Sequence, residues 1–106
     1  MTHAEIVQTI TEAGLRVETI KIYYPKTERA LEGWREVEPY SFSTDIGIEG
    51  EHLIPGREVI QPGHIFNGFT VESRDDHCDS FIIGKIKEAR RTEKKFAPRN
   101  NWKVEF

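Results

Sequence analysis

Turn-forming residues interrupt this chain at short intervals and limit it to short strands and short helices. Glycine and proline follow most of its apolar segments, and six of them fall within residues 45–63. Because proline cannot donate to a β-ladder and glycine weakens a strand, each apolar segment ends early. No apolar stretch approaches the ~20 residues of a membrane-spanning helix. With 106 residues, the chain has the length of one domain with one modest core.

The N-terminal segment predicts a helix over about residues 2–14. Thr2 stands where an N-cap is needed, and Glu5 follows it at the spacing of a capping box. Apolar residues recur at helical spacing on one face, namely Ile6, Val7, Ile10 and Ala13. Gly14 is typical of a left-handed C-terminal cap. The helix therefore has one apolar face, which must pack against the rest of the domain.

The remaining apolar segments predict short strands. Their residue ranges are 17–24, 34–37, 64–72, 80–86 and 102–106, and residues 87–92 either continue the fourth strand or turn. Gly68 interrupts the third segment and predicts a bulge or a close approach of backbones. We therefore expect a mostly β (α+β) fold, a small five-stranded barrel over about residues 17–106 with a short N-terminal helix. The whole chain, 1–106, is then one domain.

The charges of the chain are unevenly distributed. Residues 1–84 carry 7 basic and 15 acidic side chains, whereas residues 85–106 carry 8 basic and 3 acidic ones. Such a split can mark a basic face for an anionic partner. The alternative is that the basic segment is attracted to the acidic remainder of the same domain. Basic residues interleaved with Phe96 and Trp102 resemble a nucleic-acid-binding stripe, and a solvated surface strand explains them as well.

Several functional classes lack their sequence signals. The single cysteine, Cys78, excludes an internal disulfide framework, and the N-terminus lacks the features of a signal peptide, so we expect a cytoplasmic protein. No phosphate-binding glycine motif occurs. Residues 75–79 hold several metal-ligand types, but not the spaced pairs of a zinc site, so an exposed hairpin turn is the expectation. A nucleophile pair of Cys78 with His64 or His77 has little support, and we expect neither metal, cofactor nor catalysis.

Three stretches together resemble the WYL domain, a small SH3-like or Sm-like β-barrel of bacterial transcription and phage-defence regulators. They read Ile-Lys-Ile-Tyr-Tyr at 20–24, Trp-Arg-Glu-Val-Glu-Pro-Tyr at 34–40, and Ser-Phe-Ile-Ile-Gly-Lys-Ile-Lys-Glu-Ala at 80–89. Their order and rough spacing agree with that family over about residues 18–96. The Trp-Tyr-Leu motif itself is absent, and His64-Ile65-Phe66 is the best candidate for its strand.

The resemblance implies a ligand-sensing domain linked to transcriptional regulation. It would bind an anionic ligand, a nucleotide or single-stranded nucleic acid, at a patch of basic and aromatic residues. Arg35 and Lys85 would supply charge, and Tyr23 and Phe66 would supply stacking surface beside His64. A separate DNA-binding or regulatory protein is a further expected partner, while no membrane association is expected.

Two other readings remain open from the sequence. SH3-like barrels also bind peptides in aromatic grooves, so a protein-interaction module is the alternative. A small hydrolytic enzyme would need His64, His77 or the acidic residues of 75–79 to converge in one pocket. Each basic side chain also has a plain structural explanation, in which Arg35 pairs with a neighbouring glutamate and Lys85 faces solvent.

Overall fold

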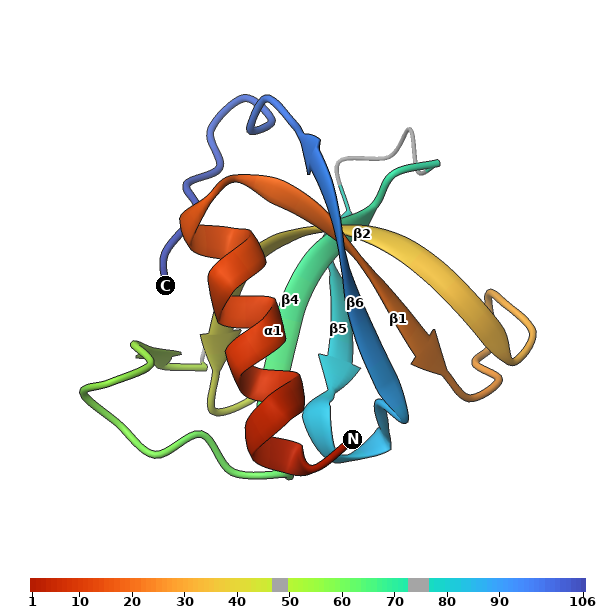
Figure 1. The fold of residues 1–106 in the computed structure, drawn as a ribbon, viewed down its shortest axis with the longest axis horizontal. Coiled ribbons are helices and arrows are strands. Elements are labelled where there is room, and N and C mark those ends of the chain that lie inside the picture. Colours follow the sequence, from red (N-terminus) through yellow and green to blue (C-terminus); the bar gives the residue numbers. More distant parts are fainter. Residues whose placement is uncertain (47–49, 73–76) are drawn as a thin grey trace.

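The computed structural model describes residues 1–46, 50–72 and 77–106 (Figure 1). Within these residues one α-helix precedes six strands, and a short 3-10 helix, η1, lies between the last two strands. In chain order the elements are α1 (His3–Leu15), β1 (Glu18–Tyr24), β2 (Gly33–Ser43), β3 (His52–Leu53), β4 (Ile65–Thr70), β5 (Asp79–Ile82), η1 (Ile83–Lys85) and β6 (Glu88–Lys95). No helix of this described part is long and apolar enough to cross a membrane.

Helix α1 begins with the predicted capping box. The Glu5 amide donates to Thr2 Oγ1 at 3.1 Å, and the Thr2 amide donates to Glu5 Oε1 at 2.8 Å. The predicted C-cap at Gly14 was wrong, because Gly14 is helical and Val17 takes the positive φ of 54°. Gly14 instead allows the Phe106 ring to pack directly against the helix, where a Cβ atom would overlap it.

The strands form one antiparallel sheet in the order β5-β4-β2-β1-β6, with β3 paired to the far end of β2. The sheet is rolled, because β1 and β5 are three positions apart yet the Tyr24 and Phe81 ring centroids are 5.1 Å apart. A flat sheet would separate these strands by about 14 Å. The Ile82 amide also donates to Tyr24 Oη at 2.9 Å, which links the β5 edge to β1. The mostly β class is therefore confirmed, as a rolled but open sheet.

The predicted number of five strands was wrong. The 80–86 segment ends as a strand at Ile82 and turns through η1, and β6 follows as a separate strand. Polar residues fill β6, in which Ala89 is buried, so its sequence gave little apolar alternation. The apolar residues of 102–106 do not form a strand; Glu105 makes a single bridge to Ser41.

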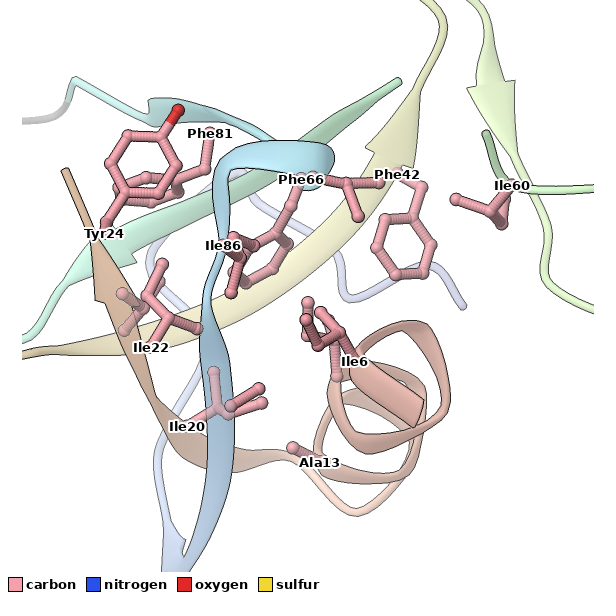
Figure 2. Packing of buried hydrophobic residues seen from close by; sticks show 14 of the residues in the cluster. Ile6, Ala13, Ile20, Ile22, Tyr24, Phe42, Ile60, Phe66, Phe81 and Ile86 are labelled. Atoms are coloured by element: carbon pink, nitrogen blue, oxygen red, sulfur yellow. The ribbon is translucent and has the colours of Figure 1, made fainter. Parts of the chain in front are cut away.

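The main core lies between α1 and the concave face of the sheet. Figure 2 shows labelled side chains of α1, β1, β2, β4 and β5 converging there, and the cluster includes Ile6, Ile10, Ile20, Ile22, Val37, Phe42, Phe66 and Phe81. Burial of Phe81 was expected and is confirmed. Gly68 is a site of close backbone approach, as predicted, because a Cβ there would lie 2.8 Å from the Glu38 carbonyl oxygen. The core thus unites the helix and the rolled sheet.

A second aromatic cluster lies on the outer face of β2 and β4. Phe69 and Tyr40 pack there against each other, with ring centroids 5.4 Å apart. The chain after β6 covers them, because the Trp102 ring lies 5.0 Å from Phe69 and 5.8 Å from Tyr40. Arg99 stacks over Phe69 at 4.4 Å and donates to Glu38. This cover accounts for the apolar residues near the C-terminus.

Candidate functional site

One end of the rolled sheet is hollowed, and we call this site the Arg35 hollow. Its volume is about 1100 Å³. The end of β1, the β1–β2 connection and the starts of β2 and β5 contribute most of its walls. The lining residues are Tyr24, those of 26–31 and 34–36, Ile46, Thr70, Glu72, those of 79–81, and Lys85.

Arg35 is held in a defined position in this hollow. It pairs across the sheet with Ile22, a core residue, and residues that pair directly share a face, so its side chain starts toward the concave face. Its guanidinium carbon lies 5.2 Å from the Tyr24 ring centre and 5.9 Å from that of Phe81. The Nη2 atom of Arg35 donates to the Pro25 carbonyl at 3.1 Å and to the Leu31 carbonyl at 3.4 Å. No ion pair with a strand glutamate fixes it within the described residues.

Arg35 also retains unused hydrogen-bonding capacity. Its Nε is buried and has no acceptor among the residues that the structure describes. Buried hydrogen-bond donors nearly always have an acceptor in folded proteins, so a buried Nε without one is unusual. A guanidinium presents a planar fork that matches a carboxylate or a phosphate. Arg91, which pairs with Glu18, also has a buried Nε without an acceptor among the described residues, so this feature alone does not separate an anion contact from a structural role.

Lys85 lines the same hollow from a distant part of the chain. The turn of η1 after β5 places it there, and its side chain is exposed. In the described part of the chain it makes neither an ion pair nor a hydrogen bond through its ammonium group. The structure thus brings together two of the predicted site residues, Arg35 and Lys85.

The total charge of the hollow is nevertheless balanced. Its four basic side chains are Lys26, Arg29, Arg35 and Lys85, and its four acidic ones are Glu28, Glu36, Glu72 and Asp79. The hollow therefore presents no broad positive potential to a distant polyanion. Any preference for an anion has to come from the local arrangement of Arg35 and Lys85.

The rim of the hollow is apolar, and sequence reasoning did not single it out. Three exposed side chains line it: Leu31 at 78% exposure, Ile46 at 64% and Trp34 at 44%. No sequence signal distinguishes Trp34 from a core tryptophan, because its face depends on the pairing of β2 with β1, which places it beside Tyr23 on the outer face. An exposed tryptophan offers an aromatic surface for stacking a planar ligand.

Tyr23 lies on the outer face of the sheet and does not line the hollow. It pairs with Trp34, and their ring centroids are 5.5 Å apart. Its hydroxyl donates to Glu32 at 3.3 Å. Lys87 lies 5.8 Å from the centre of the Tyr23 ring, and Arg90 lies 5.1 Å from that of Trp34. Tyr23 can therefore support Trp34 but does not contact a ligand inside the hollow.

The other two predicted site residues lie elsewhere. Phe66 is completely buried between Phe42 and Phe81, so its predicted role as a stacking surface was wrong. Successive side chains of a strand point to opposite faces, and Phe66 occupies a position of β4 whose side chain points into the core. His64 precedes β4 and does not line the hollow; its Nδ1 accepts from the Gln61 amide at 2.9 Å. The site is therefore smaller than the sequence suggested.

The surroundings of Cys78 do not activate its thiol. Burial and then the nearby Asp79 carboxylate raise the pKa of the Cys78 thiol to about 12, so the thiol stays protonated at neutral pH. Its sulfur is directed at the Gly68 and Asp79 carbonyls rather than at a base. No group of three or more His, Cys, Asp or Glu suited to a metal occurs in 1–46, 50–72 or 77–106. The expected hairpin turn at 75–79 lies largely outside these residues.

Comparison of the chain with protein-family models, with curated proteins and with solved structures returned no match. The resemblance to the WYL domain thus stays a prediction, and the functional argument depends on the residues of the hollow.

Proposed function

We propose that this protein is a ligand-sensing regulatory domain that binds a small anionic ligand in the Arg35 hollow. The observation that carries the proposal is the position of Arg35, which two aromatic rings and two backbone carbonyls hold at the hollow. Pre-positioning lowers the entropic cost of binding, because the side chain is already ordered. Lys85 supplies a second, exposed cation at the same site.

The chemistry of the lining favours a nucleotide over a longer nucleic acid. A polymer gains affinity mainly from many phosphate contacts on a basic surface. Here four carboxylates offset the four cations, so a ligand with one or two anionic groups fits better. The exposed Trp34 ring at the rim offers a stacking surface for a base, a contact worth about 1–3 kcal/mol. A nucleoside phosphate combines both features.

We further propose that the rolled sheet is an SH3-like barrel of the WYL type. In support, the three stretches that carry the resemblance meet in space, because Tyr24, Arg35, Phe81 and Lys85 all line one hollow. The link to transcription and to a separate DNA-binding partner depends on this resemblance. Binding rather than catalysis is proposed, since Arg35 and Lys85 are suited to holding an anion.

Isothermal titration calorimetry with adenosine, adenosine monophosphate and inorganic phosphate tests the proposal. We expect saturable binding of the nucleotide, weaker binding of phosphate, and the weakest binding of adenosine. The Arg35→Lys variant keeps the charge but loses the planar fork, so the nucleotide affinity should fall about tenfold or more. Thermal melting of the same variant establishes that it is folded.

The double variant Arg35→Lys/Lys85→Ala should bind the nucleotide more weakly than the charge-matched control Arg57→Lys/Lys103→Ala. Both control residues are exposed and lie outside the hollow. Equal losses in the two variants would indicate a diffuse charge effect and would count against this site. Absence of binding by the wild-type protein at low salt would reject a nucleotide as the ligand.

A further inference from the structure

A second hollow, which we call the α1 groove, lies between helix α1 and the segment 55–60. Its volume is about 510 Å³, and it shares no residue with the Arg35 hollow. The helix contributes His3, Ala4, Val7, Gln8, Thr11 and Glu12, and the facing segment contributes Pro55, Gly56, Glu58, Val59 and Ile60. Residues 3–12 of a helix span about 14 Å, so the groove has the length of about four extended residues.

The polar groups inside the groove are already paired with each other. His3 Nε2 lies 2.7 Å from the Ile60 carbonyl oxygen, and the Thr11 hydroxyl donates to the Val7 carbonyl at 2.7 Å. The Gln8 amide nitrogen donates to Glu12 at 3.2 Å. The walls between them are apolar, formed by side chains such as those of Val7 and Ile60. The interior of the groove therefore favours apolar groups on its occupant.

A structured turn presents an uncovered valine beside the groove. Val59 is 75% exposed although it is a large apolar residue. The turn that holds it is tied down, because the amides of Arg57 and Glu58 both donate to the Ile54 carbonyl. The Glu58 carboxylate in turn accepts from the Ile54 amide at 2.7 Å. Val59 is thus held in an exposed position and is available to a partner.

The rim of the groove is acidic. Glu12 and Glu58 lie on its two sides, and neither forms an ion pair in the part of the chain that the structure describes. Arg57, the cation nearest to Glu58 in sequence, does not line the groove. An occupant with basic groups beside its apolar ones would neutralise both carboxylates.

From the apolar walls and the acidic rim together, we infer that the α1 groove docks a short peptide segment of a partner protein. The segment carries apolar side chains flanked by lysine or arginine. Its apolar side chains contact Val7, Val59 and Ile60, and its flanking cations pair with Glu12 and Glu58. The groove is then a protein-binding surface that acts beside the ligand site and independently of it.

The test uses a fluorescein-labelled peptide, Lys-Leu-Val-Leu-Lys, whose binding to the full chain is followed by fluorescence anisotropy. A Glu-Leu-Val-Leu-Glu peptide and a Lys-Ser-Thr-Ser-Lys peptide serve as matched probes. We expect saturable binding of the first peptide and at least threefold weaker binding of the other two. Amide NMR shifts on titration should concentrate at Ala4, Val7, Val59 and Ile60.

Two variants locate the contact. Glu12→Gln/Glu58→Gln keeps the hydrogen-bond acceptors and should weaken binding about threefold or more, because each exposed ion pair contributes modestly. Val59→Ser should weaken it about fivefold or more through lost apolar contact. The controls are Glu51→Gln/Glu93→Gln and Val71→Ser, which change exposed residues outside both hollows and should leave binding unchanged.

Several results would overturn the inference. Equal binding of the lysine-flanked and glutamate-flanked peptides would show that Glu12 and Glu58 do not select a basic occupant. Shifts that avoid the four groove residues would place the contact elsewhere, and absence of binding by all three peptides would exclude a peptide of this chemistry. Sedimentation showing a dimer whose contact maps to the groove would assign the groove to a second copy of the chain.

Discussion

At the scale of single residues, Cys78 shows how burial together with a nearby carboxylate lowers the reactivity of a thiol. Its thiol is half-buried, and its raised pKa of about 12 leaves very little thiolate at pH 8. An ordinary protein thiol has a pKa nearer 8.5–9, so we expect alkylation of Cys78 by iodoacetamide to be about 10³-fold slower than that of such a thiol. Mass spectrometry of timed reactions measures the rate, with the urea-unfolded chain as control. Equal rates in the folded and unfolded chain would contradict the buried position of this thiol.

Glu18 is the opposite case, a buried carboxylate that a cation keeps charged. The Arg91 guanidinium donates to it at 2.8 Å and is the main reason that the pKa of Glu18 is lowered. Because the folded pKa lies below the unfolded value, the pair stabilises the fold above about pH 4.3 and loses this effect as pH falls through the folded pKa. We therefore expect Glu18→Gln to be less stable than wild type at pH 7, with the difference shrinking toward pH 3.

Urea unfolding at both pH values measures this difference. Glu51→Gln is the matched control, because Glu51 is exposed and its side chain forms no ion pair among the described residues. That variant should match wild type at both pH values. A cost of Glu18→Gln that is the same at pH 3 and pH 7 would show that packing, and not charge, accounts for it.

At the scale of the elements, Gly14 tests the contact between α1 and the C-terminus. Glycine to alanine inside a helix normally stabilises it by about 1 kcal/mol. Here a Cβ would overlap the Phe106 ring, so we expect Gly14→Ala to destabilise the protein by roughly 1–3 kcal/mol. Chemical denaturation measures the change. In a Phe106→Ala background the same substitution should cost less, and a stabilising Gly14→Ala in the wild-type background would show that Phe106 moves aside freely.

The same scale shows where sequence reasoning succeeds. Strand β1 was predictable because its apolar residues alternate and Pro25 ends them, and α1 was predictable from its capping box. Strand β6 was not predictable in this way, because it is an edge strand of mostly charged residues that is identified by its pairing to β1. Alternation of apolar and polar residues in a sequence reflects burial of one face of a strand, and β6 buries few of its side chains.

The candidate site was predictable only in part, for a related reason. Arg35 and Lys85 were singled out from the resemblance, and the fold brings them together although 50 positions separate them. The predicted ligand contacts of Phe66 and Tyr23 were wrong, because the face of the sheet on which each side chain lies depends on strand register. A shift of one residue exchanges the two faces of a strand, and pairing partners are not visible in the sequence. The exposed Trp34 emerges once β2 is known to pair with β1.

At the scale of the whole molecule, the uneven charge distribution has an internal explanation. Five cations of the basic segment 85–106 pair with glutamates of residues 1–84. The pairs are Lys87–Glu32, Arg91–Glu18, Lys94–Glu36, Lys95–Glu18 and Arg99–Glu38. The reading in which this segment is attracted to the acidic remainder of the domain therefore fits the structure better than a free nucleic-acid stripe. Only Lys87–Glu32 has both side chains exposed, and such a pair contributes little to stability. In the other four pairs the glutamate is largely buried.

This internal pairing leads to a prediction for polyanions. Binding of a labelled single-stranded oligonucleotide, followed by fluorescence anisotropy, should be weak at low salt. Its affinity should fall with salt at a slope corresponding to about one or two phosphate contacts, because the paired cations release few counterions. Adenosine monophosphate should compete for whatever binding remains, since both ligands would use Arg35. A steep slope, corresponding to about five or more contacts, would mean that the ion pairs of the basic segment open to phosphates. The small-anion proposal would then give way to a nucleic-acid surface on β6.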